Sequence, residues 1–337
     1  MTNSPISSKV AKEEINIGIG SISRKSASLI FAFFVAGFGF SLWYLNAYFS
    51  GDQEHYANFY NSLYHMQIEN WADLQRRNLG SSEPLYRYVI GVAAYFGIDR
   101  IIYLSIWNGL LISAISYALI KNKSSVIFSI LLITNYYLVV IIGPAERLKF
   151  AYLFLIVAAS IKSIRVRYIL SIVSVFFHTQ AIIQFISSGL NFIVKNRKKY
   201  LKSPLRSLIM ASMMLATLTA AGFVFYSSMG EAITSKSAGY AEISGGAGEI
   251  IQWALLLVVG AYVFRDKLAY VAGMLPMGVF TFLYGSRVNV ATFVFFAALA
   301  MSQRKTKNPI IILVMGYMSF KSFHFIQDVI RYGTGYP

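Results

Sequence analysis

The segment SASLIFAFFVAGFGFSLWYLNAYF, residues 26–49, decides the fold class of this chain. It contains no charged side chain and is rich in Phe, Leu and Ala. A helix needs roughly 20 mostly apolar residues to cross the hydrocarbon core of a bilayer. The segment therefore predicts a membrane-spanning helix. No small-residue cleavage site follows a short apolar core, so we interpret it as an uncleaved span after a cytoplasmic N-terminal segment, residues 1–25.

The rest of the chain has a similar composition. Of its 337 residues, 56% are hydrophobic and 13% are charged, against roughly 25% charged in a soluble protein. We expect an all-α, polytopic transmembrane helical bundle of about 9–11 membrane helices. One transmembrane domain is expected at residues 26–323, followed by a short C-terminal tail at residues 324–337. The absence of cysteine excludes disulfides, thiolate metal sites and cysteine nucleophiles.

Positive charge is concentrated between the apolar runs. The formal net charge is +16, which in a soluble protein would suggest nucleic acid as a partner. In a membrane protein, Lys and Arg collect in cytoplasmic loops because positive charge resists translocation. The main basic clusters lie at residues 162–167, 195–199 and 304–307. We therefore interpret them as cytoplasmic and expect no nucleic-acid partner.

Two apolar segments do not fit a simple span. Residues 84–98 are short, and a re-entrant segment is favoured there because it leaves Lys121 and Lys123 in the cytoplasm. Residues 168–194 have basic clusters at both ends, which two half-helices meeting near His178-Thr179-Gln180 would keep on one side. A broken helix at membrane depth is tolerated only where it lines a protein-enclosed or wet cavity. The second segment is therefore a candidate site.

The remaining spans alternate across the membrane. They are expected at residues 101–120, 126–142, 150–161, 208–226, 249–264, 268–284, 288–301 and 310–323, with outer loops near 50–83 and 227–248. This topology leaves several basic residues on the outer side, where the charge rule depletes them. These are Arg76, Arg77, Arg87, Arg147, Lys149, Arg287 and Arg331. An anionic substrate at the outer leaflet is one explanation for them.

Candidate sugar-binding residues follow the first span. Asp52, Tyr56 and Tyr60 have a spacing of four, which places them on one face of a helix. A carboxylate with two aromatic rings suits a sugar, because hydroxyls bond to the carboxylate and the apolar face of the sugar packs on a ring. The alternative is an acidic helix end with tyrosines at the membrane interface.

Two residues are candidates for acid–base chemistry. Glu83 precedes Pro84, so it either begins a helix without further function or binds a hydroxyl and acts as a general base. His178 lies in a strongly apolar segment. It is either a core histidine or a general base, since imidazole titrates near neutral pH.

Two arginines are candidates for binding phosphate. Arg147 lies beside Glu146 at an expected outer turn, and Arg287 lies at another. The planar guanidinium gives paired, charge-assisted bonds to phosphate. For Arg147 the alternative is a surface ion pair, with Glu146 or with an aspartate. The histidines have no helical spacing with carboxylates that would indicate a metal site, so no metal or cofactor is expected.

The order of these motifs resembles that of the EpsG-like, Wzy-type O-antigen polymerase family. The matching stretches are Gly51-Asp52 with Tyr56 and Tyr60, Glu83-Pro84-Leu85-Tyr86, Arg147, Phe177-His178-Thr179-Gln180-Ala181, and Tyr284-Gly285-Ser286-Arg287. The resemblance covers roughly residues 25–300. The chain departs from the family at Phe176-Phe177, where a small residue usually precedes the histidine, and the outer loop rich in Ser and Gly has no counterpart in the family.

The resemblance implies a metal-independent membrane glycosyltransferase at the periplasmic face of the bacterial inner membrane. The donor would be a growing glycan on undecaprenyl diphosphate, and the acceptor an undecaprenyl-diphosphate-linked repeat unit. Arg147 and Arg287 would hold the diphosphate, His178 or Glu83 would take the acceptor proton, and Asp52 and the tyrosines would hold sugars. Membrane lipid and a polysaccharide chain-length regulator are the further partners implied.

Other functions remain open. An O-antigen ligase uses the same donor but usually carries a large outer loop, and the loops here are modest. A lipid-linked oligosaccharide flippase or transporter should show internal repeats and charges near span centres, and inspection finds neither. A sugar acyltransferase would need a histidine facing the cytoplasm, which His178 satisfies only if the expected topology is wrong there.

Overall fold

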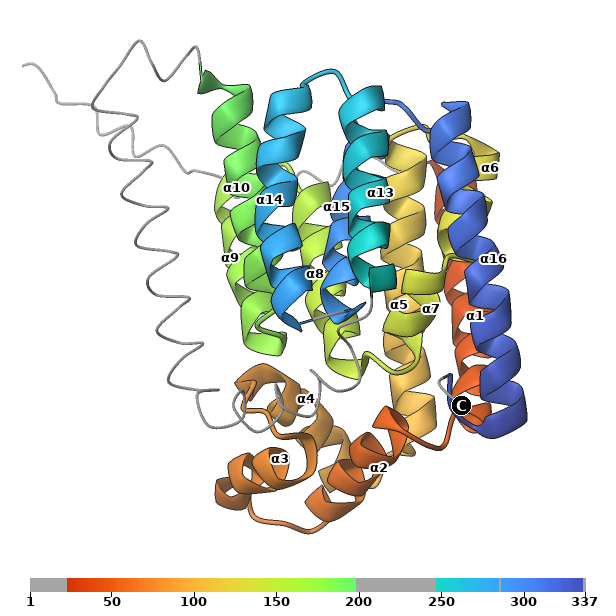
Figure 1. Ribbon diagram of the computed structural model, residues 1–337. Coiled ribbons are helices and arrows are strands. Elements are labelled where there is room, and N and C mark those ends of the chain that lie inside the picture. Colours follow the sequence, from red (N-terminus) through yellow and green to blue (C-terminus); the bar gives the residue numbers. More distant parts are fainter. Residues whose placement is uncertain (1–22, 198–246, 285, 336–337) are drawn as a thin grey trace, which may run out of the picture.

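The computed structural model describes residues 23–197, 247–284 and 286–335 (Figure 1). Within these ranges the regular structure is entirely helical, which confirms the all-α part of the predicted fold class. Three of the described helices are long and apolar enough to cross a membrane: α1 (Arg24–Ala47), α5 (Arg100–Lys121) and α16 (Pro309–Tyr332). The predicted span at 208–226 and nearly all of the predicted loop at 227–248 lie outside the described residues.

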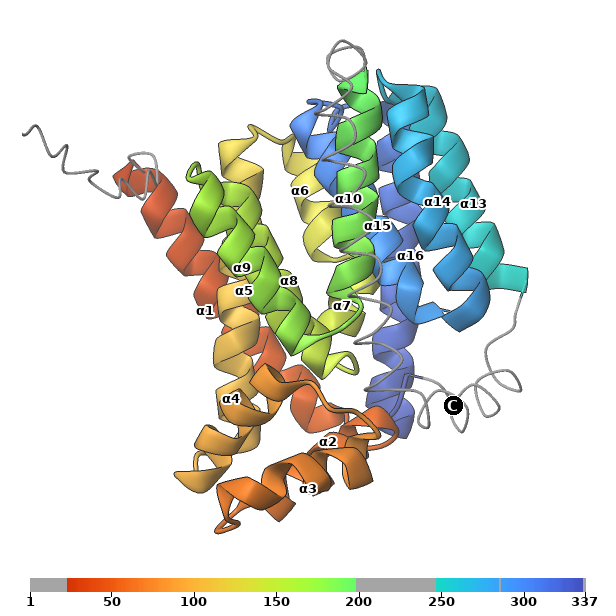
Figure 2. The ribbon, with the colours of Figure 1, turned by 90° about the vertical axis from the view of Figure 1, so that its left-hand side faces the viewer.

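The other upright helices are shorter. They are α6 (Val126–Ile133), α7 (Tyr136–Ile142), α8 (Glu146–Ser160), α9 (Ile164–Phe177), α10 (Ala181–Lys195), α13 (Ala247–Val263), α14 (Lys267–Tyr284) and α15 (Ser286–Ser302). With α1, α5 and α16 they form the bundle seen in Figures 1 and 2.

The first span forms as predicted and packs against α5. Ser23 caps α1 by accepting a hydrogen bond from the backbone of Ser26 at 3.2 Å. Gly37 and Gly109 let the two helices approach closely, since a Cβ added at Gly37 would lie 3.0 Å from Ile112. Small residues commonly permit such close packing between helices in membranes.

The polar segment after α1 folds into three short helices at one end of the molecule. These are α2 (Asp52–Leu63), α3 (Trp71–Leu79) and α4 (Pro84–Tyr95), with a 3-10 turn at Ile68–Asn70. They lie together beneath the upright helices in both views, and we call residues 52–95 the helical cap (Figures 1 and 2). The 12 residues of α4 extend about 18 Å. This helix is therefore too short to run the length of the bundle.

The predicted helix break at His178 is present. Helix α9 ends at Phe177, His178 adopts an extended conformation (φ −160°, ψ 125°), and α10 begins at Ala181. Both helices rise from this turn toward the end of the molecule opposite the cap (Figure 2). The turn therefore lies near the cap, while the start of α9 and the end of α10 lie at the opposite end of the molecule.

The segment predicted as a span at 126–142 is not one helix, because the chain breaks between α6 and α7. Asn135 caps α7 by accepting from the backbone of Tyr137 at 3.0 Å. Ser322 of α16 donates to the carbonyl of Thr134 at 2.5 Å. Polar side chains therefore satisfy the backbone groups that the break exposes.

Two helices begin or end at residues other than those predicted from the sequence. Helix α8 begins at Glu146, not near Phe150, so the expected outer turn is partly its first helical turn. Helix α16 continues past Phe323 to Tyr332 and is capped by Gly333, whose φ is +70°. The carbonyl of Gly333 accepts from the backbone of Phe49 and Ser50, which ties the end of α16 to the end of α1.

Two hydrophobic clusters make up the core. The larger joins α5, α7 and the helices from α13 to α16, and the smaller joins the cap to α8 and α9. In the smaller cluster Phe150 stacks on Phe177 with ring centroids 5.5 Å apart, and Tyr86 packs edge-on against Phe150 at 5.8 Å. This aromatic packing brings the start of α4, the start of α8 and the α9–α10 break together.

Candidate functional site

Glu83 is the centre of the candidate site. It is the residue before α4 and is 3% exposed. Its two carboxylate oxygens accept from Nη1 of Arg147 at 3.0 and 2.8 Å. Nδ1 of His178 lies 2.9 Å from Oε1 of the same carboxylate. One buried carboxylate therefore binds an arginine of α8 and the histidine of the helix break, and we call this group the Glu83–Arg147 site.

Arg147 is held on two sides. It is the second residue of α8 and is 8% exposed. Besides the bonds to Glu83, its Nε donates to the hydroxyl of Tyr56 at 3.3 Å. Within the described ranges its Nη2 has no hydrogen-bond partner. The guanidinium is therefore fixed in orientation while one of its donor groups is available to a ligand.

His178 is positioned by the helix break and by Glu83. Its backbone N–H donates to the carbonyl of Ser174 at 3.1 Å, which closes the last turn of α9. Its neighbour Phe177 is buried against Phe150 and Phe154, so the chain enters the break in a defined direction. The carboxylate at Nδ1 then fixes the plane of the imidazole, as an acidic partner commonly does for a catalytic histidine.

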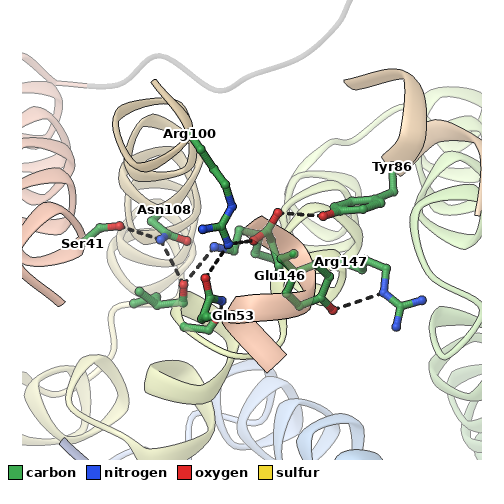
Figure 3. A network of polar contacts seen from close by, with 11 residues as sticks. Ser41, Gln53, Tyr86, Arg100, Asn108, Glu146 and Arg147 are labelled. Carbon is green, nitrogen blue, oxygen red and sulfur yellow. Dashed lines mark hydrogen bonds and ion pairs between the residues drawn. The ribbon is translucent and has the colours of Figure 1, made fainter. Parts of the chain in front are cut away.

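A second ion pair lies directly beside the first. Glu146 is fully buried and accepts from the hydroxyl of Tyr86 at 2.7 Å and from Nη2 of Arg100 at 2.8 Å. The same Arg100 nitrogen donates to Oε1 of Gln53 at 2.5 Å. Figure 3 shows Tyr86 and Arg100 approaching the Glu146 carboxylate from opposite sides. This pair joins the cap to α5 and α8.

The end of α7 is bound by side chains from three other elements. Ile142 O accepts from Nζ of Lys149 at 2.9 Å and from Asn108 at 3.1 Å, and Gly143 O accepts from Gln53 at 2.8 Å (Figure 3). The last carbonyls of a helix lack partners within it. Their partners here include Lys149, which is almost fully buried.

The buried charges form two ion pairs. Arg147 pairs with Glu83, and Arg100 pairs with Glu146. Buried charges are costly unless they are paired. Nη2 of Arg147, which has no hydrogen-bond partner within the described ranges, is therefore the group that favours an anionic ligand.

The electrostatics distinguish Glu83 from a general base. Burial raises the pKa of its carboxyl, but the Arg147 guanidinium and the His178 bond outweigh burial and hold the pKa below the ordinary value of 4.5. Such a carboxylate stays ionised at all physiological pH values and is a weak proton acceptor. Burial raises the pKa of the Tyr56 hydroxyl, so this residue stays neutral and serves as a hydrogen-bonding group.

The structure brings four of the seven predicted site residues together: Tyr56, Glu83, Arg147 and His178. Tyr60 lies on the same helix as Tyr56, but its hydroxyl donates to the carbonyl of Ile98 at 2.6 Å, in the connection between α4 and α5. Burial raises the pKa of Tyr60 to about 12.

The two remaining predicted residues are Asp52 and Arg287. Asp52 is in the first turn of α2 and is partly exposed, and its charge acts on the hydroxyl of Tyr56. Arg287 is the second residue of α15, and its side chain lies outside the described part of the chain.

The alternative of a surface pair at Glu146-Arg147 is wrong. Both residues are buried, and they pair with different partners because successive helical residues point in different directions. Sequence reasoning missed the roles of Gln53, Tyr86, Arg100 and Lys149. Of these four residues, Tyr86 alone belongs to a motif that the sequence analysis singled out, the Glu83-Pro84-Leu85-Tyr86 stretch. Arg100 follows Asp99, the residue that caps α5, and nothing local indicates the distant carboxylate that Arg100 binds.

A scan against protein-family models, a search of curated proteins and a search of solved structures each found no match to this chain. Within the described ranges no group of three His, Asp or Glu side chains is arranged to hold a metal ion. The chemistry of the Glu83–Arg147 site is therefore argued from its own side chains.

Proposed function

We propose that this protein is a polymerase of lipid-linked surface polysaccharide. It transfers a growing glycan from undecaprenyl diphosphate to an incoming undecaprenyl-diphosphate-linked repeat unit. The observation that carries the proposal is the buried Arg147, held by Glu83 and Tyr56 beside His178. In this proposal an anion-binding donor and a proton acceptor lie together where apolar helices meet a polar cap.

In the proposed topology the cap faces the periplasm and the chain is a polytopic protein of the inner membrane with about 9–11 membrane helices. The basic cluster at residues 304–307 lies between α15 and α16, at the end of the bundle opposite the cap (Figure 1). The pair α9 and α10 is a re-entrant hairpin whose two basic ends stay in the cytoplasm. Its turn carries His178 to the depth of Arg147, as expected for broken helices that line a site.

Arg147 binds the diphosphate of the donor in this proposal. A guanidinium forms short, charge-assisted bonds to phosphate oxygens. When the sugar–diphosphate bond breaks, negative charge develops on the leaving group, and a fixed donor in a water-poor site stabilises that charge strongly. The available Nη2 of Arg147 supports this role. Arg287, which the sequence also predicts for phosphate, is proposed as the second donor.

His178 accepts the proton of the acceptor hydroxyl. That oxygen attacks C1 of the donor's linking sugar, its proton passes to Nε2 of His178, and the C1–O bond to the diphosphate breaks with both electrons leaving on undecaprenyl diphosphate. The sequence left the base open between His178 and Glu83. The ion pair with Arg147 and the lowered pKa of Glu83 favour His178, with Glu83 orienting both partners.

Deleting the gene in its native strain tests the proposal. Surface polysaccharide is run on a silver-stained gel beside a strain rescued from a plasmid. Collapse of the ladder to a single repeat-unit band is the expected result. Loss of every band that carries repeats would indicate flipping or ligation instead, and an unchanged ladder would reject all three functions.

A further inference from the structure

A second polar pocket lies apart from the Glu83–Arg147 site. It lies between the start of α7, the first turns of α13 and the last third of α16, and its volume is about 250 Å³. Its lining includes Tyr137, Glu249, Gln252, Lys321 and Asp328. Nothing in the proposed transfer reaction uses these side chains.

The pocket interrupts the apolar face of a candidate membrane helix. Lys321, His324 and Asp328 all line it from α16, at spacings of three and four that place them on one side of the helix. The same helix is apolar enough to cross a membrane. Ionisable residues in such helices are expensive and usually functional, so their convergence on one pocket indicates a ligand.

Two contacts hold the polar groups of the pocket in place. The hydroxyl of Tyr137 donates to Oε1 of Gln252 at 2.7 Å, so the amide nitrogen of that side chain remains a donor. The ammonium of Lys321 lies 4.3 Å from the centre of the Tyr136 ring, a cation–π contact that fixes its position. The pocket thus offers oriented donors beside two carboxylates.

The charge of the pocket is opposite to that of the Glu83–Arg147 site. Glu249 and Asp328 contribute −2 and Lys321 contributes +1, which leaves −1 with His324 neutral. This balance disfavours a phosphate. Carboxylates, an amide and an ammonium together match a ligand with several hydroxyls, because each hydroxyl both donates and accepts.

We propose that this pocket binds one uncharged sugar residue of the glycan. Its volume is below the roughly 300–1,000 Å³ of pockets for drug-sized ligands, which suits a single ring. Helix α7 separates the two sites, with Tyr136 and Tyr137 at one end and the bonded carbonyls of Ile142 and Gly143 at the other. Its seven residues extend about 10 Å. That this sugar belongs to the transferred glycan rests on the proposed function.

Sugar binding is measured directly, without catalysis. The probe is the repeat-unit oligosaccharide, released from the native strain by mild acid. The released oligosaccharide lacks the diphosphate. Saturation-transfer NMR is recorded with the purified full-length protein in detergent. We expect signal from the wild type, and binding about tenfold weaker in Asp328→Asn and Glu249→Gln, since each loses a charged acceptor. Asp266→Asn is the matched control and should bind normally, because this carboxylate caps α14 at the opposite end of the bundle.

The outcomes separate this inference from the proposed function. No signal with the wild type, or unchanged binding in both carboxylate variants, overturns the sugar site. If one variant fails to fold in detergent, the other decides. A collapsed ladder on gene deletion together with absent sugar binding rejects only the pocket, whereas an unchanged ladder rejects the polymerase.

Discussion

At the scale of single residues, the proposed function depends on charges buried where apolar helices meet the cap. Glu83 accepts from both Arg147 and His178, and Glu146 accepts from both Arg100 and Tyr86. Each carboxylate therefore joins the cap to the bundle. Breaking such a buried pair costs about 3–5 kcal/mol, because it leaves an uncompensated charge. The same groups determine both the stability of this region and its chemistry.

Replacing Arg147 with Lys should abolish polymer while keeping a positive charge beside Glu83. An ammonium cannot bond to Glu83, Tyr56 and a phosphate with the geometry of a guanidinium. We expect the loss of a fixed donor to reduce transfer by about 10²–10³-fold. The measurement is the polysaccharide ladder of a deletion strain that expresses the variant at wild-type level. Arg76→Lys is the control, since Arg76 is exposed on the cap and pairs with Asp73, and a normal ladder from Arg147→Lys would contradict the proposal.

Replacing His178 with Asn should separate catalysis from folding. Asparagine can still donate to Glu83 but cannot accept a proton at neutral pH. We expect kcat to fall by about 10²–10⁴-fold with little change in KM or in melting temperature. Purified protein with purified lipid-linked repeat units gives all three quantities. Unchanged kcat would exclude His178 as the base.

Glu83 should contribute stability that depends on pH. Its pKa is lower in the folded protein than the ordinary 4.5, so the stabilisation is fully present above about pH 5 and is lost as the pH falls toward the folded pKa. We expect the melting temperature of the wild type to exceed that of Glu83→Gln by a constant amount from pH 8 to about pH 5, with the gap narrowing below. A gap that widened on acidification would contradict the ion pair.

At the scale of elements, short helices and breaks position the site. The chain breaks at Thr134-Asn135 and at His178, and both breaks are stabilised by polar side chains or by aromatic packing. The break at His178 turns the chain back beside Glu83 of the cap. The α7–α8 connection is closely packed, because Gly143 lies directly against Tyr44.

Adding one methyl group at Gly143 should disturb the site. A Cβ there would lie 2.5 Å from the Tyr44 ring, and Gly143 O must also keep its bond from Gln53. We expect Gly143→Ala to lower stability by about 1–3 kcal/mol through overpacking. Thermal unfolding in detergent measures the effect. Gly189→Ala is the matched control, because nothing lies within 4 Å of its added Cβ, and equal melting temperatures for the two variants would show that the contact relaxes freely.

At the scale of the whole molecule, the proposed arrangement puts the cap outside and the ends of the α9–α10 pair inside. The chain has no cysteine, so single cysteines report sidedness without background. We expect Asn61→Cys on the cap to react with an impermeant maleimide in intact spheroplasts. Lys162→Cys and Arg197→Cys, both at exposed positions, should react only after permeabilisation. Labelling of these two positions from opposite sides would show that α9 and α10 cross the membrane as one span.

The sequence by itself determined the class of the molecule and part of the site. Uncharged apolar runs require helices in a bilayer, because an unsatisfied backbone is too costly there, and α1, α5 and the break at His178 follow from composition and charge placement alone. Glu83, Arg147 and His178 were recognisable as candidates because charged or titratable residues beside apolar runs are energetically costly and are usually functional.

Only the tertiary structure decided which of these groups meet. Pairing of Glu83 with Arg147 and of Arg100 with Glu146 joins residues 64 and 46 positions apart, and no local pattern encodes such a contact. The burial of Lys149, the split of α6 from α7 and the pocket on α16 also depend on neighbours from distant segments. Local sequence sets which helices form, while the energy of a buried charge depends on what packing places around it.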